Sequence, residues 1–125
     1  MNILFADDME INRFLVSSVL KNCGHNIETL TDGDELLERL ASGQRPDLVI
    51  TDNNMIRVDG LDVLWRIRKD DRYEGLKSLP IIVYTDSERA KTEIEALGGI
   101  LVNKVVDELV AAVDAIAYKI EKERG

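Results

Sequence analysis

Cysteine, proline and long apolar runs are scarce in this chain of 125 residues. A single thiol, Cys23, can form neither an internal disulfide nor a thiolate metal cluster, so a reducing compartment and a buried place for Cys23 are expected. No stretch approaches the roughly 18 apolar residues of a membrane span, and the start of the chain lacks the basic and apolar segments of a secretory signal. The sequence therefore predicts a cytoplasmic protein without a membrane partner.

Positive charge is also scarce. The sequence contains 16 Lys and Arg residues and 24 Asp and Glu residues, which gives a net charge of -8. Without a basic stripe, direct binding to nucleic acid is not expected. Hydrophobic residues make up 45% and charged residues 32%, a composition typical of ordered globular proteins. No linker or repeat interrupts the chain, so residues 1–125 are predicted to form one domain.

Five short apolar runs alternate with segments whose apolar residues recur every three or four positions. The runs predict strands at 2–6, 26–30, 47–51, 80–85 and 99–103, and the segments between and after them predict helices. Strands that alternate with helices pair in parallel through right-handed crossovers. The predicted fold class is α/β, with a doubly wound five-stranded parallel sheet flanked by five helices.

All five predicted helices have an apolar face, and the last, over 109–120, follows the helical period most clearly. The first shares one apolar face among Ile11, Phe14, Leu15 and Val19 and ends before Gly24. The second begins at Asp32 or Asp34 as its N-cap and ends at Gly43. The fourth is thinly apolar and is expected from about Ser87 to Leu97.

Polar residues close all five predicted strands, at the edge where open parallel sheets bind ligands. The second strand, which ends in Thr31 and Asp32, is the less distinctive exception, and the residues that close the other four are the candidates for a site. They are Asp7 and Asp8, then Asp52, then Thr85 and Asp86, and finally Asn103 and Lys104. Taken alone, an Asp at such a place is most often a helix cap and a Lys a solvated charge. Their coincidence at successive strand ends instead predicts one shared site.

Three neighbouring carboxylates repel one another, which raises their pKa values unless a cation is present. Oxygen donors without sulfur or a nearby histidine favour Mg²⁺ over zinc, and Mg²⁺ keeps ligand positions for water and a phosphate oxygen. Asp52 is then a candidate nucleophile, because a carboxylate can accept a phosphoryl group as an acyl phosphate. Thr85 and Lys104 are candidates to contact the phosphoryl oxygens.

Four segments, "FADDMEIN", "DLVITDNNMIRVDG", "IIVYTDS" and "LVNKV", carry a resemblance that spans nearly the whole chain. In order and spacing they resemble the receiver domains of two-component response regulators. The resemblance implies the flavodoxin-like strand order 2-1-3-4-5. It also implies a protein that catalyses only its own phosphorylation and dephosphorylation and that signals through contacts with a downstream protein.

The resemblance assigns a role to each site residue. Asp52 would accept the phosphoryl group from a histidine kinase or a phosphotransfer protein. Asp8, Asp52 and the backbone carbonyl of Asn54 would bind Mg²⁺ directly, while Asp7 would act through water. Thr85 and Lys104 would contact the phosphoryl group.

The sequence departs from the family pattern at several positions. Leu101 stands where an aromatic residue is usual, and Val105 stands where a proline usually follows the lysine through a cis peptide bond. Asp86 replaces a residue that is usually small, and its charge could repel a phosphodonor or give the metal a further ligand. The segment from Thr85 to Lys104 is also short, which predicts a reshaped fourth helix. A receiver-like interaction module that no longer switches therefore stays open as an alternative.

Enzyme functions fit the motifs less well. A phosphatase of the haloacid dehalogenase type would need a second Asp at the position of Asn54, and a dinucleotide site would need a glycine-rich turn after the first strand. A flavin site is not excluded by fold alone.

Overall fold

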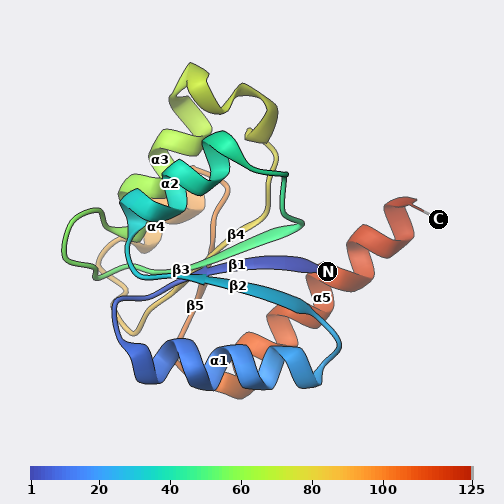
Figure 1. Ribbon diagram of the computed structural model, residues 1–125. Coiled ribbons are helices and arrows are strands. Elements are labelled where there is room, and N and C mark those ends of the chain that lie inside the picture. The colour runs from blue at the N-terminus through green and yellow to red at the C-terminus, as the bar shows by residue number, and fades with distance from the viewer. Residues whose placement is uncertain (125) are drawn as a thin grey trace.

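The computed structural model describes residues 1–124. Five parallel strands form one sheet in the order β2-β1-β3-β4-β5 (Figure 1). The strands are β1 (Asn2–Ala6), β2 (Asn26–Leu30), β3 (Leu48–Asp52), β4 (Ile81–Tyr84) and β5 (Ile100–Val102). The predicted fold class and strand order are confirmed, and each strand boundary lies within one residue of the predicted run.

Helices cover both faces of the sheet. One face carries α1 (Glu10–Asn22) and α5 (Val106–Arg124), and the other carries α2 (Gly33–Ser42), α3 (Gly60–Lys69) and α4 (Lys91–Ala96) (Figure 1). A short 3-10 helix, η1 (Asp71–Leu76), connects α3 to β4. Within residues 1–124 no helix combines the length and the apolar character needed to cross a membrane.

The core lies in two layers, one on each face of the sheet. Alternate strand residues supply the two layers, so a central strand must be apolar on both sides. On β3 every residue is buried, and Val49 packs toward α2 and α3 while Leu48 and Ile50 pack toward α1 and α5. This double burial explains the continuous apolar run that precedes Asp52.

The apolar face predicted for the first helix, α1, is not the side that packs against the sheet. Ile11, Phe14 and Leu15 are 56%, 67% and 47% exposed, whereas Val16 and Leu20 are buried. Apolar residues occupy more than one side of this helix, so the helical period fits two orientations, and the packing against the sheet selects between them. Cys23 is likewise exposed rather than buried.

The fourth helix is shorter than predicted. Instead of beginning near Ser87 it spans only Lys91–Ala96. Residues 89–90 form a turn, which Lys91 closes by donating its N–H to the carbonyl of Glu88. Arg68 of α3 donates to the carbonyl of Leu97 at 2.8 Å, which satisfies an acceptor just beyond the end of this helix. Both predicted ends of the second helix are confirmed, because Asp32 is the N-cap and Gly43 the C-cap of α2.

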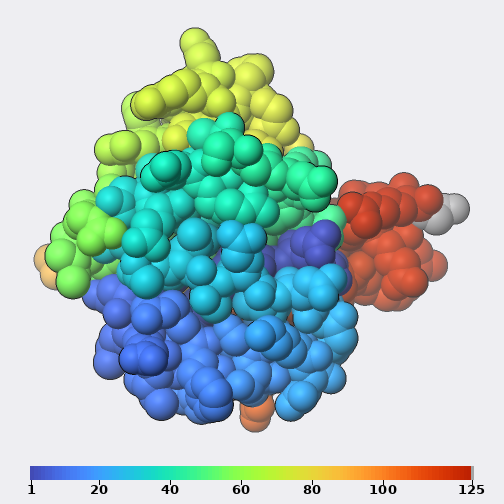
Figure 2. Space-filling model, in the orientation of Figure 1, coloured from blue at the N-terminus to red at the C-terminus, as the bar shows by residue number. Residues whose placement is uncertain are grey.

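The last turns of α5 extend past the edge of the sheet where the strands begin (Figures 1 and 2). Arg124 pairs there with Asp47 at 2.8 Å, and Asp47 also accepts a hydrogen bond from the backbone N–H of Asn2. Asp47 directly precedes β3, whereas Asp52 ends it, so the two acids lie at opposite edges of the sheet.

Candidate functional site

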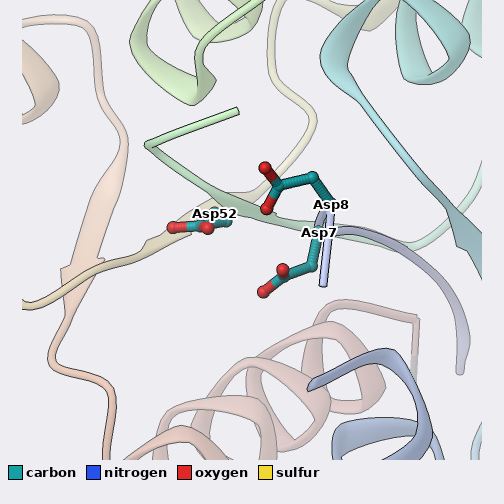
Figure 3. Close-up of side chains that lie close together, drawn as sticks. All are labelled: Asp7, Asp8 and Asp52. Carbon is teal, nitrogen blue, oxygen red and sulfur yellow. The ribbon is translucent and has the colours of Figure 1, made fainter. Parts of the chain in front are cut away.

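Three carboxylates converge at the carboxyl edge of the sheet. Because β1 and β3 are adjacent and parallel, with Ala6 paired to Thr51, the residues that follow Ala6 lie beside Asp52. One oxygen from each of Asp7, Asp8 and Asp52 lies within 4.8 Å of the others (Figure 3). The predicted grouping of these acids is confirmed.

The two acids at the end of β1 differ in their surroundings. Asp7 is fully buried, and its carboxylate accepts hydrogen bonds from the backbone N–H of Met9 at 2.9 Å and the side chain of Asn12 at 3.2 Å. Asp8 is partly exposed. Since the oxygens of Asp7 already have donors within the start of α1, Asp8 is the freer of the two to bind a cation.

Lys104 supplies a positive charge to the cluster. Its Nζ lies 3.2 Å from Oδ2 of Asp52 and 3.9 Å from Oδ2 of Asp7. Burial nevertheless dominates at Asp52, which is 3% exposed, and together with the charge of Asp7 it raises the pKa of Asp52 against the lowering effect of Lys104. Because the charges of Lys104 and Asp7 act in opposite directions, burial decides that the pKa of Asp52 is raised.

Thr85 and Asp86 line the other side of the site. Thr85 is buried, and its hydroxyl accepts the backbone N–H of Ser87 at 3.2 Å. Asp86 accepts the backbone N–H of Lys104 at 3.0 Å, so its carboxylate joins the loop after β4 to the loop after β5. With Asn54, these residues surround an open hollow beside Lys104.

The peptide bond between Lys104 and Val105 is trans, as are all peptide bonds of residues 1–124. The loop that carries Lys104 is instead held by the Asp86 carboxylate and by a hydrogen bond from the N–H of Val105 to the carbonyl of Asn103 at 2.7 Å. Asp86, which the sequence suggested as a charge directed at a phosphodonor or a metal, has a structural contact that sequence reasoning missed.

The loop between β3 and α3, residues 53–59, contains another missed contact. The side-chain oxygen of Asn53 accepts the N–H of Leu61 at 3.0 Å, and its carbonyl accepts the N–H of Gly60 at 3.1 Å. A Cβ at Gly60 would lie 2.5 Å from the carbonyl oxygen of Asp52, so only glycine allows α3 to begin so close to the phosphoacceptor candidate. An acid just before a helix is the usual N-cap signal, and Asp59 does occupy the N-cap position of α3. Its side chain, however, accepts a hydrogen bond from the N–H of Met55 and none from the first turn of the helix.

Comparisons with known proteins show which family has this fold. The model of the family described as "Response regulator receiver domain" matches residues 3–114. The chain belongs to the receiver domain family of two-component response regulators.

Two curated relatives are chemotaxis proteins. The chain is 37% identical to CheY-3 of Vibrio cholerae over 97 residues, which cover 77% of this chain and 72% of that protein. It is 34% identical to CheY of Pseudomonas aeruginosa over 123 residues, 98% of this chain and 94% of that protein.

A solved structure shows the same fold. The response regulator TrrA of Thermotoga maritima, in complex with Mg²⁺-BeF, superposes with a TM-score of 0.77 at 31% identity, covering 92% of this chain and 97% of that one. The receiver resemblance and the flavodoxin-like strand order are thereby confirmed, while the roles of individual site residues stay predictions.

Proposed function

We propose that this receiver domain is a phosphoacceptor, in which Asp52 takes a phosphoryl group from the phosphohistidine of a histidine kinase or phosphotransfer protein. The observation that carries the proposal is the placement of Asp52. A buried carboxylate with a raised pKa ends the central strand beside two further carboxylates and a lysine. A structural carboxylate would instead have enough donors to lower its pKa, as Asp47 has.

The donor set of the site fits Mg²⁺. Asp8 and Asp52, with the backbone carbonyl of Asn54, would hold the ion directly, and Asp7 would act through a water molecule. When bound, Mg²⁺ would neutralise part of the charge that develops on the phosphoryl oxygens. The complex of TrrA with Mg²⁺-BeF supports the same ion for this chain.

The chemical step requires only groups that the chain presents. An oxygen of Asp52 attacks phosphorus, an O–P bond forms, and the N–P bond of the donor histidine breaks, so that its electron pair returns to the imidazole. Lys104 and the Thr85 hydroxyl would then contact the transferred oxygens. Hydrolysis of the acyl phosphate returns Asp52, so the catalysis proposed is restricted to the domain's own phosphorylation and dephosphorylation.

A protein donor is supported by the surface beside the site. Met9 follows Asp8 directly, and with Ile11, Phe14 and Leu15 it forms an exposed apolar surface at the start of α1, here called the α1 surface. Exposed apolar side chains that adjoin one another mark contact surfaces more often than chance. A small phosphodonor has no use for such a surface, whereas a protein that presents a phosphohistidine can pack against it.

One observation favours the second candidate, a receiver-like interaction module that binds a partner without switching. Leu101 is partly buried against the core at the position where family members usually carry an aromatic residue. Calorimetry with Mg²⁺ separates the two functions, because the module would not need the ion.

The proposal is tested by intact mass spectrometry after incubation with acetyl phosphate and Mg²⁺. Wild type should gain one phosphoryl group, and Asp52→Asn should gain none. Asp47→Asn is the matched control, since it removes an acid at the opposite end of the same strand and should leave the adduct intact. Wild type that stays unmodified at every Mg²⁺ concentration would contradict the proposal.

A further inference from the structure

Asp32 holds the loop that follows Asp52. This acid stands between β2 and α2, is 1% exposed, and accepts four backbone N–H groups. One oxygen accepts from Gly33 at 2.7 Å and Val58 at 2.9 Å, and the other accepts from Ile56 and Arg57, both at 3.1 Å. Three of the four donors belong to residues 53–59, although Asp32 lies more than 20 positions earlier in the chain.

Gly33 allows this close approach. A Cβ at position 33 would collide with the carbonyl oxygen of Val58 and would lie 2.9 Å from both the Cβ of Val58 and a methyl group of Val63. No larger residue therefore fits between the start of α2 and the loop. Asp32 and Gly33 together form a buried contact against residues 56–58.

The contact is electrostatically favourable despite its burial. Burial by itself raises the pKa of Asp32, but the hydrogen bonds from Val58, Arg57 and Gly33 and the charge of Arg57 outweigh burial and lower that pKa. Arg57 also pairs with Asp34 at 2.7 Å on the surface. Exposed ion pairs of this kind contribute little, so the buried carboxylate is the main anchor.

The position of Asn54 depends on two anchors. Asn53, on one side, is hydrogen-bonded to the first turn of α3, and residues 56–58, on the other side, are hydrogen-bonded to Asp32. Between them lie Asn54, whose N–H donates to Asp52 at 3.4 Å, and Met55, which is buried and donates its N–H to Asp59 at 3.3 Å. These two hydrogen bonds are longer than the bonds to Asp32, so release of the second anchor would leave the carbonyl of Asn54 less firmly placed relative to Asp52.

We propose that Asp32 is a positioning residue of the phosphoacceptor site, which fixes residues 53–59 so that the backbone carbonyl of Asn54 is presented to the Mg²⁺ beside Asp52. The inference rests on the proposed function of that site. It assigns to Asp32 control over Mg²⁺ affinity, and through the ion over the rate of phosphorylation, without contact between Asp32 and the reacting atoms.

The test compares Mg²⁺ binding by calorimetry in wild type, Asp32→Ala and Asp47→Ala. Removing an outer residue that orients a metal ligand weakens metal binding by roughly 10- to 100-fold, so the dissociation constant of Asp32→Ala should rise by at least about 10-fold. Asp47→Ala also removes a carboxylate that accepts a backbone N–H, but at the opposite edge of the sheet, and its dissociation constant should equal that of wild type.

A kinetic measurement separates positioning from general destabilisation. The rate of phosphorylation by acetyl phosphate is divided by the folded fraction, which circular dichroism measures at the same Mg²⁺ concentration, because Mg²⁺ binding also favours the folded state. This corrected rate should fall in Asp32→Ala at low Mg²⁺ and recover at saturating Mg²⁺, whereas Asp47→Ala should match wild type at both concentrations. Gly33→Ala pushes Val58 away but keeps the Asp32 carboxylate, and its phosphorylation rate should depend on Mg²⁺ in the same way as that of Asp32→Ala. This variant replaces Asp32→Ala in the test if Asp32→Ala does not fold.

Wild-type Mg²⁺ affinity in folded Asp32→Ala or Gly33→Ala would overturn the inference while leaving the proposed function intact. Failure of wild type itself to bind Mg²⁺ or to accept a phosphoryl group would overturn the proposed function. A rate deficit that Mg²⁺ does not rescue would show that Asp32 has only a structural role.

Discussion

The Asp52→Asn substitution should stabilise the fold. Asp52 is 3% exposed, and burial raises its pKa, so the charged form is less favourable in the folded chain than in the unfolded one. At neutral pH the amide removes this unfavourable charge while it keeps the shape of the side chain. The gain should vanish as the pH falls below the ordinary value of 3.8, because Asp52 is then protonated in both states.

The magnitude follows from the neighbours of Asp52. At an effective dielectric constant of about 20, Lys104 at 3.2 Å attracts the carboxylate by roughly 5 kcal/mol, and buried Asp7, within 4.8 Å, repels it by roughly 3.5 kcal/mol. Partly exposed Asp8 adds roughly 1 kcal/mol of repulsion at the dielectric constant of water. These terms nearly cancel, so the desolvation penalty, several kcal/mol for a buried ion, decides the sign.

We expect a net stabilisation of roughly 1 to 3 kcal/mol, which for a domain of this size raises Tm by roughly 4 to 10 °C. Thermal unfolding at pH 7 in the presence of a chelator measures it. Asp47→Asn is the control, and its change in stability should have the opposite sign. Hydrogen bonds lower the pKa of Asp47, so loss of this carboxylate should reduce the free energy of unfolding by about 1 kcal/mol. A Tm of Asp52→Asn at or below that of wild type would refute the electrostatic reasoning.

Three further results are expected. Mg²⁺ at 100 times its dissociation constant should stabilise wild type by about 2.7 kcal/mol. The stabilisation should be smaller at acidic pH, because protons compete with the ion for the Asp52 carboxylate. An unchanged Tm would count against a metal site. Lys104→Met should bind Mg²⁺ more tightly, because the lysine ammonium lies 3.2 Å from Asp52 and competes with the ion. The same variant should accept the phosphoryl group at least about 10-fold more slowly, because under the proposed function the lysine would also contact that group. Phe14→Ser should change the free energy of unfolding by at most about 0.5 kcal/mol, because Phe14 is exposed. It should slow phosphoryl transfer from a phosphohistidine protein but not from acetyl phosphate. Equal slowing with both donors would argue against the α1 surface as a docking site.

The sheet could be predicted from sequence because parallel strands covered on both faces must be continuously apolar. The run from Leu48 to Ile50 is such a case, and its end predicted where Asp52 lies. The inward face of α1 could not be predicted, since Phe14 and Val16 both belong to apolar stripes of one helix. Only the packing of that helix on the sheet distinguishes them.

The candidate site was predictable to the extent that it depends on strand ends. Asp7, Asp8 and Asp52 meet because β1 and β3 are adjacent. The contacts of Asn53 and Asp86 depend on the paths of loops, which no periodic pattern encodes. Each looked like an ordinary turn residue or a surface charge, and its hydrogen-bond partner comes from another element or from a later position in the chain.

The central claim is that Asp52 itself carries the phosphoryl group, and chemical mapping tests it most directly. Borohydride reduces an acyl phosphate and leaves a permanent mark on the acceptor, which peptide mass spectrometry locates. After brief exposure to acetyl phosphate and Mg²⁺, the account predicts a single mark, on Asp52. His25 is the single histidine of the sequence and so the one imidazole that could accept a phosphoryl group instead. A mark on Asp7 or Asp8, a phosphoryl group on His25, or no modification at all would contradict the account.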